Sequence, residues 1–242
     1  MRALLLERAR RLRLTEREIP TPEPGEVLLR VEACALSEGD YESWYRGNGR
    51  LPRVPGSEIV GTVEALGDGE TSTRQSGSSL DPQSESSSRT EDTKIIPFFQ
   101  PGRNRLALGA RVVVSPYLLG RRHGSQELLG YDRDGGLQEF LSVPQELCFV
   151  VEDDRDIREL ACISAFSEAL AHVDELEVTP GEVVVVSGAE GIGSLTALAT
   201  TLRGATAVLV DPKQARLEQA SALGIPYVVN PFRSSVPDEL SW

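Results

Sequence analysis

The first part of the chain alternates apolar and polar positions in short runs, which is typical of half-buried β-strands. Residues 25–34 (GEVLLRVEAC) place Val27, Leu29, Val31 and Ala33 on one face of such a strand. A polar segment that begins ALSEGDYESW follows and is taken to be a turn. Further strands are expected within 55–67, 106–116, 135–144 and 147–151. These runs predict a β-rich domain over residues 1–155.

The pattern then changes to helical spacing over 156–173, where apolar residues recur every three or four positions. Beyond it, strands alternate with amphipathic helices. Strands are expected at 181–188, 206–211 and 226–230, and helices at 191–204 and 212–224. The run VVVV predicts a first strand that is buried on both faces.

This β-α-β-α-β order is the mononucleotide-binding half of a doubly wound parallel sheet. A second half would need roughly a hundred more residues than the chain has. The sequence therefore predicts an α/β protein, with a partial Rossmann domain over 156–242 that is truncated after its third strand.

The composition changes abruptly between two of the β segments. Residues 71–90 contain eight serines and a single aliphatic side chain, Leu80. Such a stretch cannot bury enough apolar surface to offset its ordering entropy. Residues 68–103 are therefore expected to be a disordered Ser-rich insertion.

Charge and cysteine content exclude some classes of function. The formal net charge is −12, which argues against a nucleic-acid partner, because such binding depends on Lys and Arg neutralising phosphates. No apolar run approaches the roughly 18 residues of a transmembrane helix, so no membrane span is expected. The three cysteines, Cys34, Cys148 and Cys162, are scattered and form no CxxC pair. They indicate a reducing compartment, and a cytoplasmic location is expected.

The segment VVVVSGAEGIG, followed by VLVD, carries the strongest chemical signal. A strand, a glycine turn and a helix start in this order can hold a pyrophosphate on unpaired backbone N–H groups. An acidic residue at the end of the second strand accepts hydrogen bonds from the adenosine ribose, which favours NAD over NADP. The expected cofactor-binding residues are Gly188, Gly191, Ile192, Gly193, Asp211 and Arg216. Arg216 leaves NADP possible, since a guanidinium tolerates a phosphate.

One residue departs from the usual spacing of this turn. Glu190 occupies the position where GxGxxG has its middle glycine. A carboxylate that faces a pyrophosphate lowers the affinity unless it turns to solvent or forms an ion pair. An ordinary βα turn without a ligand therefore remains the alternative.

Several segments together resemble the medium-chain dehydrogenase/reductase superfamily, which includes zinc-type alcohol and polyol dehydrogenases and quinone oxidoreductases. The segments are PTPEPGEVLLRVEACALSEGD, PGSEIVGTVEALG, DGGLQEFLSVP, VTPGEVVVVSGAEGIG and DPKQARLEQASALG. The resemblance covers about 1–67 and 106–232. It implies a GroES-like β domain, a nucleotide-binding domain, and hydride transfer in the cleft between them.

Zinc members of the superfamily hold a catalytic metal through three ligands. The resemblance implies that the matching positions in this chain are Ser37, Ser57 and Cys162. Glu58 matches the glutamate next to the second ligand. Serine hydroxyls are poor zinc ligands next to thiolate and imidazole. The segment 115–136 also lacks the cysteines of the structural zinc site. No zinc is therefore expected, and Ser37 and Ser57 are predicted to line the substrate cleft as hydrogen-bond donors. Cys34 is expected to be a small buried residue.

The resemblance leaves two possible origins open. The PGSE segment resembles quinone oxidoreductases, which lack the zinc ligands. The D-x-x-x-W segment resembles polyol-type zinc dehydrogenases, from which this chain would have descended with loss of the metal. The expected function is NAD(P)-dependent, zinc-independent hydride transfer to or from a small carbonyl, enone, quinone or alcohol. The alternative is a non-catalytic or truncated relative, and the superfamily's dimer surface is expected to be missing.

Overall fold

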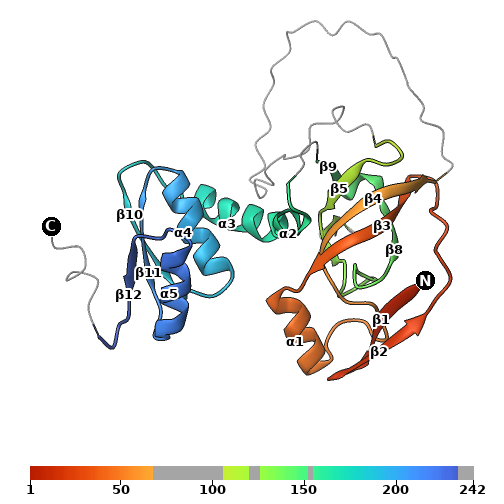
Figure 1. Cartoon of the computed structure of the whole chain (residues 1–242), viewed down its shortest axis with the longest axis horizontal. Coiled ribbons are helices and arrows are strands. Elements are labelled where there is room, and N and C mark those ends of the chain that lie inside the picture. Colours follow the sequence, from red (N-terminus) through yellow and green to blue (C-terminus); the bar gives the residue numbers. More distant parts are fainter. Residues whose placement is uncertain (68–105, 120–125, 152–154, 234–242) are drawn as a thin grey trace, which may run out of the picture.

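The computed structural model describes residues 1–67, 106–119, 126–151 and 155–233. The Ser-rich insertion expected at 68–103 lies outside these residues. The largest sheet has five antiparallel strands in the order β8-β3-β4-β5-β9 (Figure 1). They are β3 (Glu26–Ala35), β4 (Glu58–Leu66), β5 (Arg111–Val114), β8 (Phe140–Pro144) and β9 (Cys148–Val150). Two hairpins accompany it, β1 (Arg2–Arg8) with β2 (Arg11–Glu16), and β6 (Tyr117–Leu119) with β7 (Gln126–Leu128).

The core of this β domain forms where apolar side chains of neighbouring strands meet on one face of the sheet. Val27 and Leu29 are fully buried there, as the alternation predicts. Their buried neighbours include Ile59, Val63, Val112, Val114, Leu141 and Val143. On another part of the sheet, Val60 and Val113 pack against Leu160. This second contact attaches the helical segment that follows the β domain.

A helix stands where the sequence analysis expected a polar turn. Helix α1 spans Glu38–Arg46, with Ser37 as its N-cap and Gly47 in the left-handed conformation at its C-cap (φ 70°). The prediction of a turn was wrong because this helix is short and half polar. Its ends are fixed by capping, which hydrophobic periodicity does not report.

The single helix expected over 156–173 is two helices in the structure. Helix α2 (Ile157–Ala161) ends at Cys162, and α3 (Ile163–Glu175) begins there. Helix α3 then packs against the next helix through Ala169, Val173 and Ala199. In Figure 1, α2 and α3 bridge the β domain and the parallel sheet.

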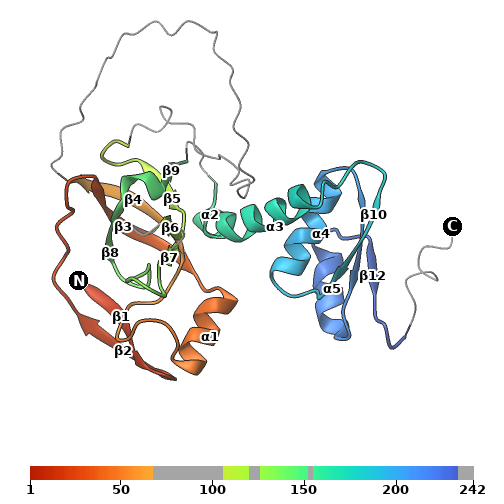
Figure 2. The same ribbon diagram turned by 180° about the vertical axis from the view of Figure 1, so that it is seen from behind.

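The C-terminal part is a parallel sheet in the order β10-β11-β12 with helices between its strands. Its elements are β10 (Val183–Ser187), α4 (Ile192–Leu202), β11 (Thr206–Val210), α5 (Gln214–Ala222) and β12 (Tyr227–Val229). Figure 2 shows α4 and α5 on the same side of the strands. A β-rich domain followed by a parallel βαβαβ unit is the α/β architecture that the sequence predicted.

The predicted burial of β10 on both faces was wrong for the described residues. Val183 and Val185 are 48% and 55% exposed, whereas Val186 packs into the core beneath the helices. Helices α4 and α5 cover one face of the sheet, so Val183 and Val185, which lie on the other face of β10, stay about half exposed. Within those same ranges, no helix is long and apolar enough to cross a membrane.

Candidate functional site

Three residues follow the carboxyl ends of the parallel strands and therefore lie at one edge of the sheet. Two of them were predicted to bind a cofactor. Gly188 follows β10, Asp211 follows β11, and Asn230 follows β12. In open α/β sheets, ligands bind at this edge. Asn230 was not singled out from the sequence. It is buried, and its side-chain oxygen accepts a hydrogen bond from the Phe232 N–H at 3.1 Å.

The turn between β10 and α4 requires glycine at several positions. Gly188 and Gly191 have positive φ angles, 97° and 49°, which side-chain-bearing residues rarely adopt. A Cβ atom at Gly193 would lie 1.9 Å from the Gly188 carbonyl oxygen. The backbone of the first helical turn therefore packs directly on the end of the strand.

The start of α4 offers backbone donors to a ligand. Its N-cap is Gly191, which makes no side-chain cap, and its first turn contains no acidic residue. Ile192, predicted as a cofactor contact, is the first residue of the helix and is 36% exposed. Uncapped N–H groups at a helix N-terminus form a site suited to an anion.

Asp211 braces this turn from the neighbouring strand. Its side chain is buried, and one carboxylate oxygen accepts a hydrogen bond from the Ala189 N–H at 2.9 Å. The other oxygen accepts one from the Lys213 N–H at 2.6 Å. Each carboxylate oxygen retains a lone pair beyond the one that accepts the backbone N–H.

Glu190, which occupies a glycine position of the nucleotide-binding pattern, has an ion-pair partner. Its carboxylate forms an ion pair with the Arg216 guanidinium, which also lies 3.6 Å from the Asp211 carboxylate. The Glu190 side chain is 69% exposed, whereas that of Arg216 is 28% exposed. The sequence did not predict this pairing, because Glu190 lies in the turn before α4 and Arg216 lies in the first turn of α5. The signal that could have found it is that both helices start at the same edge of the sheet.

These residues fit a nucleotide cofactor. The glycine turn leaves room for a close backbone approach, and the helix start supplies donors. Asp211 places a carboxylate at the end of β11, where such folds bind a ribose, and the Glu190 carboxylate is paired with the Arg216 guanidinium.

A second candidate corner lies in the β domain, at the start of α1. The Ser37 hydroxyl accepts a hydrogen bond from the Asp40 N–H at 3.1 Å and donates one to the Asp40 carboxylate at 2.9 Å. The other Asp40 oxygen accepts a hydrogen bond from the Gly56 N–H at 2.9 Å. Asp40 thereby joins the helix start to the segment that carries Ser57. Sequence reasoning did not assign Asp40 this role.

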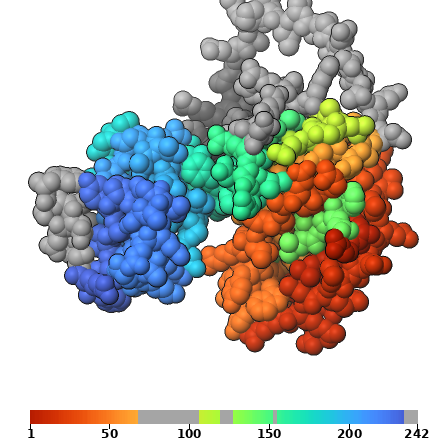
Figure 3. All heavy atoms as spheres, viewed as in Figure 1, coloured from red at the N-terminus to blue at the C-terminus, as the bar shows by residue number. Residues whose placement is uncertain are grey.

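Ser57 and Glu58 follow Gly56 and are half-buried. Within the described part of the chain, the Ser57 hydroxyl makes no hydrogen bond. The pKa of the Glu58 carboxyl is raised, chiefly by burial, and further by the carboxylates of Asp40 and Glu168. Figure 3 shows a notch between the orange surface around α1 and the blue surface of the parallel-sheet domain.

The residues at the expected metal positions do not fit zinc. The Ser37 hydroxyl is engaged in the helix cap, and Cys162 lies exposed at the junction of α2 and α3. Burial raises the pKa of the Cys34 thiol to about 12, so this cysteine holds its proton. Cys34 was predicted to be a small buried residue; it is partly buried and packs against the core. Across the described ranges, no cluster of three or more His, Cys, Asp or Glu side chains is arranged to hold a metal.

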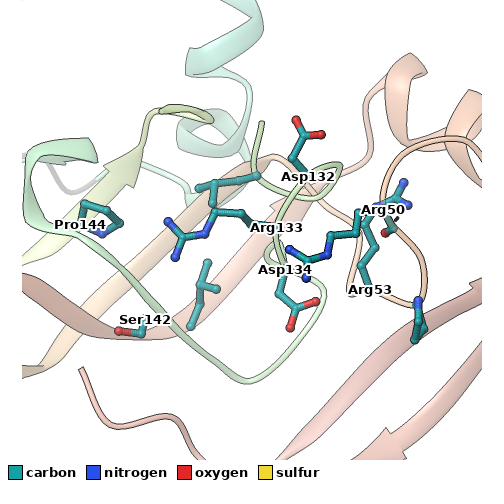
Figure 4. A pocket seen from close by; sticks show the side chains of 10 residues that line it. Arg50, Arg53, Asp132, Arg133, Asp134, Ser142 and Pro144 are labelled. Carbon is teal, nitrogen blue, oxygen red and sulfur yellow. Dashed lines mark hydrogen bonds between the residues drawn. The ribbon is translucent and has the colours of Figure 1, made fainter. Parts of the chain in front are cut away.

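A separate cavity of about 360 Å³ opens on the β domain, and Figure 4 shows the side chains around it. Arg50, Arg133 and the two aspartates Asp132 and Asp134 lie at its rim. Asp134 is already engaged, since it accepts a hydrogen bond from the Val54 N–H at 2.8 Å. None of the residues predicted from the sequence lines this cavity.

The chain is similar to known dehydrogenases in sequence and in structure. Residues 23–79 match the family of alcohol dehydrogenase GroES-like domains. The chain is 29% identical to an uncharacterized zinc-type alcohol dehydrogenase-like protein of Haemophilus influenzae, over 96% of this chain and 63% of that protein. It is 27% identical to the sorbitol dehydrogenase of Gallus gallus, over 99% of this chain and 63% of that protein.

A solved structure shares the fold over nearly the whole chain. It is the short chain alcohol dehydrogenase RspB from Escherichia coli CFT073 in complex with NADH, with a TM-score of 0.77 and 24% identity. The match covers 98% of this chain and 64% of that protein. The chain thus spans just under two thirds of the length of these relatives.

Proposed function

The chain belongs to the medium-chain dehydrogenase/reductase superfamily, and from this we propose that it binds NAD(H) and catalyses zinc-independent hydride transfer. The substrate would be a small carbonyl, enone, quinone or alcohol. The relatives named above include a sorbitol dehydrogenase and an alcohol dehydrogenase solved with NADH, which supports a nicotinamide cofactor.

The observation that carries the proposal is the Asp211 carboxylate at the glycine turn. It lies within hydrogen-bond distance of the turn backbone, at the edge of the sheet where the helix N-terminus is uncapped. Gly188 and Gly191 would leave room for the pyrophosphate, and Gly193 would let the start of the helix lie close to the end of the strand. Asp211 would hold the adenosine ribose. When bound, the nicotinamide supplies or accepts the hydride.

The substrate end of the proposal rests on Ser57. Its hydroxyl is the free one of the two predicted donors, because the Ser37 hydroxyl already donates to Asp40. A donor placed at a carbonyl oxygen stabilises the negative charge that develops there during hydride transfer. Zinc is not needed for this role, and the side chains at the expected ligand positions do not suit it.

A non-catalytic relative is the second candidate function. It is favoured by Ser37, whose hydroxyl serves the helix cap, and by Glu190, which replaces a glycine at the phosphate turn. In that case the chain would retain the fold and lose turnover.

Fluorescence titration with NADH tests the proposal first. We expect saturable binding by the wild-type chain and weaker binding by Asp211→Asn, which keeps the shape of the side chain and removes its charge. Hydrogen bonds to a charged group contribute about 1.5–3 kcal/mol, so the loss should be roughly tenfold or more in Kd. A folded chain that binds no NADH would contradict the proposal. Binding without turnover in a screen of carbonyls, quinones and alcohols would favour the non-catalytic relative.

A further inference from the structure

We infer that Glu190 is a specificity-determining residue that selects NADH against NADPH by holding Arg216 in an ion pair. The inference rests on the proposed function, because it concerns how the same site would read the adenosine ribose. It assigns a role to Glu190, which occupies the position of the middle glycine in the nucleotide-binding pattern.

The first step of the argument is the position of Arg216. Its guanidinium lies 3.6 Å from the carboxylate of Asp211, the residue proposed to hold the ribose hydroxyls. NADPH differs from NADH by a phosphate on the ribose 2′-oxygen. Arg216 is therefore a cation beside the proposed ribose site, and a guanidinium is well suited to bind a phosphate.

The second step is that this cation is already neutralised. The Glu190 carboxylate forms its ion pair with one terminal nitrogen of Arg216, and Asp211 faces the other. The three side chains carry a combined charge of −1, from two carboxylates and one guanidinium. A 2′-phosphate, which carries about −1.5 to −2, would meet this net negative charge and would have to displace Glu190. The two ribose hydroxyls of NADH meet no such obstacle.

Removing the Glu190 charge should therefore act on NADPH more than on NADH. Glu190 also lies near the proposed pyrophosphate position, so its removal should tighten the binding of both cofactors through that shared group. This common effect cancels in the ratio of the two dissociation constants. The ratio isolates the contribution of the 2′-phosphate.

The experiment compares NADH and NADPH titrations of wild type, Glu190→Gln and Glu218→Gln by nicotinamide fluorescence, with folding checked by circular dichroism. Glu218 lies exposed on α5 and forms no described ion pair, so Glu218→Gln changes the net charge equally without freeing Arg216. We expect Glu190→Gln to lower the NADPH-to-NADH ratio of Kd roughly tenfold, the value of one charge-assisted contact. Glu218→Gln should leave the ratio unchanged.

A second pair of variants tests whether the effect passes through Arg216. In an Arg216→Ala background, adding Glu190→Gln should change the ratio by much less than in the wild type, because no guanidinium remains to be released and only the direct repulsion by Glu190 is removed. Wild-type binding of NADH with an unchanged ratio in Glu190→Gln would overturn the inference and leave the proposed function intact. The same change in Glu218→Gln, or in the Arg216→Ala background, would also overturn it. Binding of neither cofactor by any folded variant would overturn the proposed function, and the inference with it.

Discussion

Asp40 joins two parts of the candidate substrate corner, and its removal gives a sharp test of the structure. One of its carboxylate oxygens accepts hydrogen bonds from the Ser37 N–H and hydroxyl, at 3.0 and 2.9 Å. The other accepts one from the buried Gly56 N–H. Substituting Asp40→Ala removes all three contacts and leaves the Gly56 N–H without its partner in a buried position.

The size of the effect follows from these contacts. Loss of an N-terminal capping interaction costs about 1 kcal/mol, and a buried unsatisfied N–H costs about 1–3 kcal/mol. Asp40→Ala should therefore lower the free energy of unfolding by about 2–4 kcal/mol. Ser37→Ala removes only the hydroxyl from the cap and should cost about 1 kcal/mol.

Urea unfolding measures both variants. Trp44 lies in α1, with its ring centroid 5.7 Å from that of Tyr41, so its fluorescence reports on this corner. Glu42→Gln is the matched control, because Glu42 lies on the same helix in an exposed ion pair with Arg46, which should contribute about 0.5 kcal/mol or less. Asp40→Ala with no more effect than Glu42→Gln would refute the reasoning. So would a Ser37→Ala variant less stable than Asp40→Ala.

Two further predictions concern titratable side chains. Among the three cysteines, only exposed Cys162 should react rapidly with a thiol reagent at pH 8, because burial raises the pKa of Cys34 and Cys148 to about 12. Cys162→Ser should abolish the fast phase, and a fast phase that survives would contradict the burial of the other two. Glu58 has a raised pKa in the folded state, so the folded chain binds its proton more tightly than the unfolded chain. Stability should therefore fall as pH rises from about 4.5 through the raised value, and Glu58→Gln should remove that part of the pH dependence. An identical pH profile of the unfolding free energy for wild type and Glu58→Gln would show that Glu58 is not desolvated.

The sequence by itself determined the types of most elements and the place of the glycine turn between β10 and α4. The alternation of apolar residues around Val27 and Leu29 is a property of one strand, and the strand-helix order of the C-terminal part can be read segment by segment. The glycines are equally local, since the φ angle of Gly188 is a property of its own backbone.

Only the tertiary structure decided the contacts that give these elements their chemistry. The hydrogen bond from the Gly56 N–H to the Asp40 carboxylate crosses from another segment of the chain to helix α1. The exposure of Val185 depends on which faces of the sheet the helices cover. The pairing of Glu190 with Arg216 arises because parallel strands bring their carboxyl ends to one edge. Periodicity reports on neighbours along the chain, and these features depend on neighbours in space.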